Sequence, residues 1–174
     1  MKIYLEKSKI YANLLRIKDA GKLAKYYSEV NKEFEINNKL SKESAIAFIR
    51  NSKINFINMQ EFHFGIYALH TNKFIGLFSI IQPEYNKKRC EIGYWIAKKF
   101  RKNGYGKDAI KVLIYFAFNI LKMKKIFAFA NLNNKASINL LKSLKFKKTT
   151  TNYRSNSAFK KNKNIAYALS YKVK

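Results

Sequence analysis

The chain has 174 residues, of which 48% are hydrophobic and 16% aromatic, which is enough apolar material for the core of one domain over residues 1–174. Its 36 Lys and Arg against 10 Asp and Glu give a formal charge of +26, which would attract phosphates or nucleic acid. Most of these cations are lysines, accompanied by many Asn, Ile, Phe and Tyr residues. This residue set favours an AT-rich coding sequence as the cause of the charge and argues against nucleic acid as a partner.

The sequence also limits the compartment and the chemistry. Cys90 is the single cysteine, so no internal disulfide can form, which fits a reducing cytoplasm. Residues 1–10 alternate charged and apolar side chains, unlike a signal peptide, and the longest apolar run, Val112–Leu121, is too short to span a bilayer. The sequence contains no Cys/His cluster, so no metal site is predicted. We expect a cytoplasmic protein with no membrane attachment.

Strand and helix patterns follow one another along the chain. Apolar runs bounded by turn signals predict strands at Ile10–Ile17, Phe62–Leu69, Phe74–Ile81, Arg89–Ala97, Lys125–Ala130, Phe146–Tyr153 and Ile165–Val173. Apolar residues at helical spacing predict helices at Ala20–Val30, Ala45–Ile49, Lys107–Leu121 and Lys135–Leu144. Asp19 and Ser41 are predicted to cap the first two helices, and residues 70–73 to form a hairpin turn.

The most informative stretch follows the strand at Arg89–Ala97 and reads Arg101-Lys102-Asn103-Gly104-Tyr105-Gly106-Lys107-Asp108-Ala109. Its glycines allow a tight turn, and the helix that follows begins with amide N–H groups that lack an intrahelical acceptor. Phosphate oxygens can accept from these groups and meet the positive end of the helix dipole. A strand, a long helix and a neighbouring strand form a crossover unit, so the sheet is mixed and the loop lies at the carboxyl end of its strand, where ligands bind. A plain turn is the alternative.

Three further motifs accompany this loop, namely Glu91-Ile92-Gly93-Tyr94-Trp95-Ile96, Asn134-Lys135-Ala136-Ser137 and Leu144-Lys145-Phe146. In this order and spacing, the motifs resemble the GNAT superfamily of acetyl-CoA-dependent N-acetyltransferases. The first motif, with Leu15-Arg16 and Asp19-Ala20, resembles the branch of ribosomal-protein N-terminal acetyltransferases, the Rim-type branch. The resemblance implies an α+β fold with a mixed, mostly antiparallel sheet of about six or seven strands flanked by about four helices.

The resemblance also implies acetyl-CoA as the acetyl donor and assigns residues to it. The pyrophosphate is expected on the loop, at Arg101, Lys102, Asn103, Gly104, Tyr105, Gly106 and Lys107. The pantetheine arm is expected to lie along the end of the strand as an added strand would, at Trp95, Ile96 and Ala97. Asn134 is expected to contact the arm and Ser137 to lie near the sulfur. Asn134 can also cap the helix that begins beside it, with Ser137 three residues on, and both roles can coexist.

Acetyl transfer needs a neutral amine, so some group must accept a proton. Glu91 is the candidate because its strand leads to the loop, and alternation places it on the same side as Gly93 and Trp95. A salt bridge from Glu91 to a lysine or arginine is the alternative. Asp108 is less suited, since in the first helical turn it complements the dipole. No acidic residue occurs between Phe146 and the end of the chain, which excludes a base from the last strands.

Other residues depart from the family pattern or favour structural roles. The tyrosine that many relatives use to protonate the leaving thiolate would fall at Leu141, so Ser137 or water must serve. Lys145 stands where a glycine is usual, which alters a turn. His63 and His70 favour structural roles over that of a base, and Cys90 favours packing over covalent catalysis. The aromatic residues of the first helices favour core packing over an acceptor pocket, namely Tyr26, Tyr27, Phe34, Phe48 and Phe56.

The predicted function is transfer of acetyl from acetyl-CoA to a primary amine, either a protein N-terminus or a small amine, by direct attack in a ternary complex. An amino group of a nucleotide-linked sugar is an alternative acceptor. A nucleotide-linked sugar is anionic, so the positive net charge of the protein would attract it. An alternative of another class is a basic domain without catalysis that binds nucleic acid or ribosomes. A homodimer is the commonest assembly for such a chain.

Overall fold

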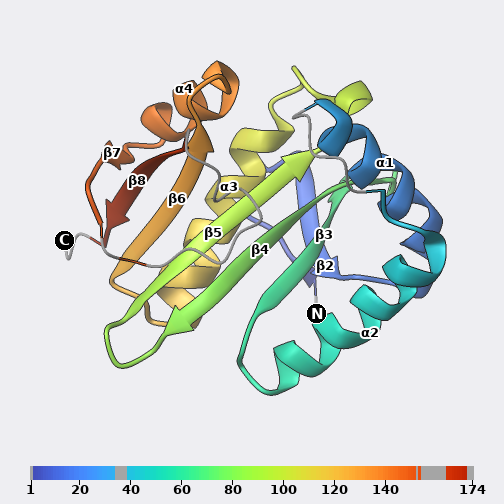
Figure 1. The fold of residues 1–174 in the computed structure, drawn as a ribbon, viewed down its shortest axis with the longest axis horizontal. Coiled ribbons are helices and arrows are strands. Elements are labelled where there is room, and N and C mark those ends of the chain that lie inside the picture. The colour runs from blue at the N-terminus through green and yellow to red at the C-terminus, as the bar shows by residue number, and fades with distance from the viewer. Residues whose placement is uncertain (1, 34–38, 152, 154–163, 172–174) are drawn as a thin grey trace. The chain divides into compact units, whose positions relative to one another are not determined.

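The computed structural model of the protein describes residues 2–33, 39–151, 153 and 164–171 (Figure 1). Its strands form a sheet in the order β1-β2-β3-β4-β5-β6-β8-β7. β5 and β6 pair in parallel, whereas β1–β2, β2–β3, β6–β8 and β7–β8 are antiparallel. The predicted α+β fold is confirmed, with eight strands instead of six or seven because the short strand β1, which was not predicted, joins the sheet.

The elements are close to the predicted ones. The strands are β1 (Lys2–Ile3), β2 (Ile10–Leu14), β3 (Phe62–Ala68), β4 (Phe74–Glu84), β5 (Arg89–Ile96), β6 (Lys125–Asn131), β7 (Lys147–Lys148) and β8 (Asn164–Ser170). The helices are α1 (Ala20–Glu33), α2 (Lys42–Ile57), α3 (Tyr105–Tyr115) and α4 (Lys135–Ser143). None of the helices in the described residues is long and apolar enough to cross a membrane.

The chain divides into two compact units, Met1–Ser79 with Tyr94–Val112 and Ile80–Gly93 with Leu113–Lys174. In the first unit α1 packs on α2, and α2 on β3 (Figure 1). The hydroxyl of Ser41 accepts a 3.0 Å hydrogen bond from the Ser44 N–H, which confirms the predicted cap of α2. The core of this unit is a cluster of Tyr11, Leu15, Ala20, Leu23, Ala24, Tyr26, Ala45, Ile49, Tyr67, Phe74, Leu77 and Ala97.

Of the aromatic residues of the first helices, Tyr26 and Phe48 pack in this core, as predicted, and Tyr27 and Phe56 contact other aromatic rings. Tyr26 belongs to the buried cluster, and the ring of Phe48 packs against it. The ring of Phe56 lies 5.5 Å from that of Phe62. Tyr27 contacts Trp95 at 6.3 Å between ring centroids. Phe34 lies outside the described residues.

The second unit contains the parallel part of the sheet. Its register pairs Arg89 with Lys125 and continues to Ile92 with Ala128, and β8 pairs with the other edge of β6. The end of α3 widens into a π-helical turn at Phe116–Ile120, with a Leu121 N–H to Phe116 carbonyl bond of 3.0 Å. Phe116, Ala117 and Phe118 are all buried in this turn.

One strand predicted in this unit was wrong in extent, and the end of another is not tested. The strand predicted at Phe146–Tyr153 is reduced to β7, whose residues Lys147 and Lys148 pair with Ala168 and Tyr167 of β8, and a single further bond runs from the Thr149 N–H to the Ala166 carbonyl. The last strand ends at Ser170, and the predicted end at Val173 lies outside the described residues. A strand needs a partner edge, and alternation along the sequence does not specify where that edge stops.

Candidate active site

The predicted phosphate loop has a backbone that only a few residue types adopt readily. After β5 the chain forms a 3-10 turn at Lys98–Phe100, and Arg101 is extended with φ −71° and ψ 169°. Lys102 and Gly104 then take positive φ values of 64° and 81°. This left-handed conformation favours glycine, so Gly104 suits the positive φ that the turn requires at its position. Helix α3 begins at the next residue.

Several backbone N–H groups along this turn form no hydrogen bond within the described residues. The first α3 bonds run from the N–H groups of Lys107 and Asp108 to the Gly104 carbonyl, at 3.0 and 3.3 Å. The N–H groups of residues 102–106 have no acceptor in the part of the chain that the structure describes. A left-handed turn that opens a helix with unpaired amides is an anion-binding arrangement.

Charged side chains surround these amides with different roles. Nε of Arg101 donates to the Ile96 carbonyl at 2.9 Å, so this side chain ties the loop to the end of its strand. Lys102 and Lys107 are exposed and add positive charge at the loop. Nζ of Lys9 lies 3.4 Å from the Asn103 carbonyl, although nothing in the sequence pointed to Lys9. The loop therefore combines free amide donors with an excess of cations.

The strand end predicted for the pantetheine arm is fixed by packing. The Ala97 N–H donates to the Ile75 carbonyl at 2.9 Å. A Cβ on Gly76 would lie 2.3 Å from the Trp95 carbonyl oxygen, so a glycine is needed for β4 to approach β5 this closely. The Trp95 ring packs on Phe74 at 6.1 Å between centroids. β5 itself continues four residues beyond Ile92, the last position of its ladder with β6.

The remaining predicted residues, Asn134, Ser137 and Glu91, lie in the second unit. Oδ1 of Asn134 accepts from the Ser137 N–H at 3.0 Å, which confirms that Asn134 caps α4 and places the two residues side by side. Ser137 is half-buried in the first turn of this helix. The cap uses the amide oxygen of Asn134, so the side-chain NH2 of Asn134 keeps donors for a ligand.

Glu91 is 2% exposed and therefore a buried carboxylate. Burial and, secondarily, the charge of Glu91 raise the pKa of Cys90 to about 12. Burial, with Glu91 as the next cause, also raises the pKa of Tyr153. Such effects place Glu91 next to both groups. Strong perturbation around a buried acid is typical of functional sites, and structural networks produce it as well.

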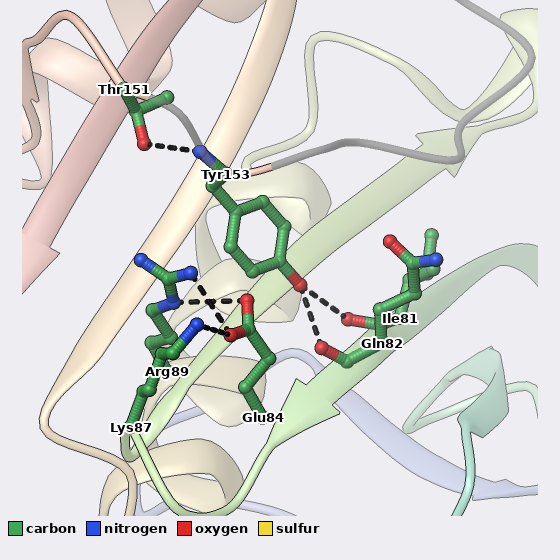
Figure 2. A network of polar contacts seen from close by, with 7 residues as sticks. All are labelled: Ile81, Gln82, Glu84, Lys87, Arg89, Thr151 and Tyr153. Atoms are coloured by element: carbon green, nitrogen blue, oxygen red, sulfur yellow. Dashed lines mark hydrogen bonds and ion pairs between the residues drawn. The ribbon is translucent and has the colours of Figure 1, made fainter.

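Tyr153 joins a polar network in this unit (Figure 2). Its hydroxyl donates to the Gln82 carbonyl at 2.7 Å, with the Ile81 carbonyl at 3.3 Å. Nε of Arg89 donates to Oε1 of Glu84, and Nη2 of Arg89 donates to Oε2 of Glu84, each at 2.9 Å (Figure 2). Arg89 thus forms a bidentate pair with Glu84. No sequence pattern indicated these contacts.

The predicted departures from the family pattern have clear structural counterparts. Leu141 is 1% exposed, so it packs in the core and offers no proton. Lys145 has φ +68°, which is the conformation that a glycine at this turn would adopt without strain. His63 is buried between the Ser79 hydroxyl, at 2.7 Å, and the Glu61 carboxylate, at 3.0 Å, which supports its structural role. Among the described residues, no group of three or more His, Cys, Asp or Glu could hold a metal ion.

The comparisons with known proteins agree with the fold. Residues 11–147 match the family model of the acetyltransferase (GNAT) domain. The chain is 26% identical over 146 residues to the uncharacterized N-acetyltransferase YoaA of Bacillus subtilis (strain 168), covering 83% of this chain and 82% of that protein. A putative ribosomal-protein-serine acetyltransferase from Vibrio cholerae has the same fold, with a TM-score of 0.83, 20% identity and 98% of each chain covered. The microcin C7 self-immunity acetyltransferase MccE, solved with acetyl-CoA and AMP, has a TM-score of 0.75 and 20% identity, with 94% of this chain and 93% of that chain covered.

A mixed sheet, in a chain whose residues 11–147 match the acetyltransferase domain, defines an acyl-transferring enzyme. The chain belongs to the GNAT acetyltransferase family.

Proposed function

We propose that this enzyme transfers the acetyl group of acetyl-CoA to a primary amine by direct attack in a ternary complex. The observation that carries the proposal is the row of amides at residues 102–106, which opens α3 without acceptors in the described part of the chain. Two phosphates need several donors on one side, and the loop offers them with the charges of Arg101, Lys102 and Lys107. Asn103, Gly104, Tyr105 and Gly106 contribute through their backbone.

The rest of the donor would follow from the strand that leads into the loop. The pantetheine arm would lie along the end of β5, at Trp95, Ile96 and Ala97, in the manner of an added strand. Both backbone groups of Ala97 are already bonded, to Ile75 and Phe100, so the hydrogen bonds to the arm would come from the preceding residues. Asn134 would hydrogen-bond the pantetheine arm with the part of its side chain that the α4 cap does not use. Ser137 would lie near the sulfur. We propose that the whole chain acts as a single domain of cytoplasmic location.

Acetyl-CoA supplies the acetyl group as a thioester. Glu91, a buried carboxylate in the strand that leads to the loop, would accept the proton of the attacking amine, directly or through water. Ser137 or water would supply a proton to the departing sulfur. Leu141 cannot donate a proton, and a thiolate whose thiol has a reference pKa of about 8.5 can leave without a strong general acid.

The acceptor we favour is a protein N-terminus or another small amine. An α-amino group has a reference pKa of about 8 against about 10.4 for lysine, so it needs less help to become neutral. A nucleotide-linked amino sugar is the second candidate. The charge of +26 would attract it, and a protein of the same fold, MccE, was solved with AMP beside acetyl-CoA.

A panel assay tests the proposal. Acetyl-CoA is expected to raise the melting temperature of the protein at millimolar concentration. Thiol release from acetyl-CoA is then measured with N-terminal peptides, amino sugars, nucleotide-linked amino sugars and polyamines. No stabilisation by acetyl-CoA and no thiol release with any acceptor would refute the enzyme. Steeply salt-dependent binding to arbitrary duplexes or to ribosomes would then favour a basic domain without catalysis.

A further inference from the structure

Lys9 is fixed beside the loop by backbone contacts on both sides. Its N–H donates to Oδ2 of Asp108 at 2.9 Å, and Asp108 lies in the first turn of α3. Its carbonyl accepts from the Leu69 N–H at 2.9 Å, at the end of β3. The residue before β2 is therefore hydrogen-bonded to the first turn of α3, which fixes the backbone of Lys9 beside the loop.

The side chain of Lys9 extends along the loop. Nζ lies 3.4 Å from the Asn103 carbonyl and 3.8 Å from the point that a Cβ on Gly104 would occupy. Lys9 is exposed, and among the described residues its ammonium forms no ion pair with a carboxylate. An ammonium has three N–H donors, so the contact with Asn103 leaves donors for an anion at the amides of residues 102–106.

Asp108 gives this charge a particular importance. Its carboxylate is the one acidic group in residues 101–109, and it lies in the helical turn that begins beside the free amides. A carboxylate so close would repel a phosphate, and a cation held next to both offsets that repulsion. Lys9 is held there by Asp108 itself, through its backbone N–H.

We propose that Lys9 is a further donor-binding residue, whose ammonium contacts a phosphate oxygen of the cosubstrate held on residues 102–106, and that Asp108 is a positioning residue for it. The proposal rests on the proposed function and extends it to a residue of the N-terminal segment. Lysine binds phosphate as a point charge, and charge-assisted N–H to oxygen bonds are among the stronger hydrogen bonds in proteins.

The test compares Lys9→Gln, Lys9→Arg and the matched control Lys7→Gln, which removes an exposed charge two residues away. Dissociation constants are measured by calorimetry for acetyl-CoA and for S-acetylpantetheine, which has no phosphate. Lys9→Gln is expected to weaken acetyl-CoA binding about tenfold at low salt. It should leave S-acetylpantetheine binding unchanged. The difference in acetyl-CoA affinity between Lys9→Gln and wild type should shrink in 1 M salt, where the Debye length is about 3 Å. Lys9→Arg should retain most of the affinity, and Lys7→Gln all of it.

Unchanged acetyl-CoA binding by Lys9→Gln would overturn the role of Lys9 while leaving the proposed function intact. An equal loss for both ligands would also overturn it, because a phosphate contact cannot affect a ligand without phosphate. Melting curves of the variants exclude unfolding as the cause of a loss. A wild-type protein that does not bind acetyl-CoA at all would refute the proposed function, and the role of Lys9 with it.

Discussion

The hydroxyl of Tyr67 donates a 2.9 Å hydrogen bond to Oδ2 of Asp19, across 48 residues of sequence. The same oxygen accepts from Nε of Arg16 at 2.7 Å. Asp19 is 4% exposed, and the guanidinium of Arg16 lies 4.1 Å from the centre of the Tyr67 ring. A buried carboxylate is tolerated when it is paired and hydrogen-bonded, so these contacts hold the turn before α1 onto β3.

Tyr67→Phe removes one donor to this carboxylate and leaves the ring packing in place. Hydrogen bonds to charged groups contribute about 1.5–3 kcal/mol, so we expect the free energy of unfolding to fall by about 2 kcal/mol. Urea denaturation measures the change. Tyr4→Phe, at a residue that is 62% exposed, is the control and should change little. Equal stability of Tyr67→Phe and wild type would show that Arg16 alone satisfies Asp19.

Lys145→Gly is expected to stabilise the protein. Lys145 follows α4 with φ +68°, and its N–H and that of Phe146 donate back to the Lys142 and Leu141 carbonyls. A side chain costs about 1 kcal/mol or more in this conformation, and glycine adopts it freely. The expected gain is about 1 kcal/mol, read from the denaturation midpoint. Lys142→Gly, inside α4, should instead lower stability by about 1 kcal/mol. A destabilised Lys145→Gly would mean that the lysine side chain makes contacts that exceed the strain.

Cys90 gives the stability an alkaline dependence with a definite sign. Burial raises the pKa of its thiol from 9.0 to about 12, so in this range the unfolded chain loses a proton that the folded chain keeps. Its contribution is fully present below pH 9 and decreases as pH rises from 9 toward 12. Between pH 9 and pH 10.5 the loss should be about 2 kcal/mol. Cys90→Ala should show a smaller loss over that interval than wild type, measured by urea denaturation at each pH. Equal losses would refute the assignment to Cys90.

Glu91→Gln tests the proposed base. The amide keeps the size of the side chain but cannot accept a proton at neutral pH, so kcat should fall by about 10²–10⁴-fold and the pH dependence of the rate should change. Thiol release against pH with the best acceptor of the panel measures both. Glu29→Gln, which changes a carboxylate on α1, is the matched control. A normal rate and pH profile in Glu91→Gln would assign this buried acid a structural role.

The sequence predicted those features that short stretches of chain decide for themselves. The Ser41 cap, the hairpin between β3 and β4, and the glycine turn before α3 depend on contacts between residues close in sequence. Extents were less accurate. The strand predicted to end at Tyr153 stops at Lys148, and the long helix ends in a π-helical turn, because partner strands and core packing decide where an element ends.

The loop at residues 101–107 and its place after β5 are therefore properties of the sequence itself, since turn geometry and helix ends follow from local residue types. The surroundings of the loop are properties of the tertiary structure. Lys9 meets Asp108 across 99 residues, and Tyr153 reaches Gln82 across 71. Pairings at such separations depend on how strands and helices pack, and no local spacing encodes them. Only the tertiary structure places Lys9 beside the amides of residues 102–106 and Tyr153 near Glu91.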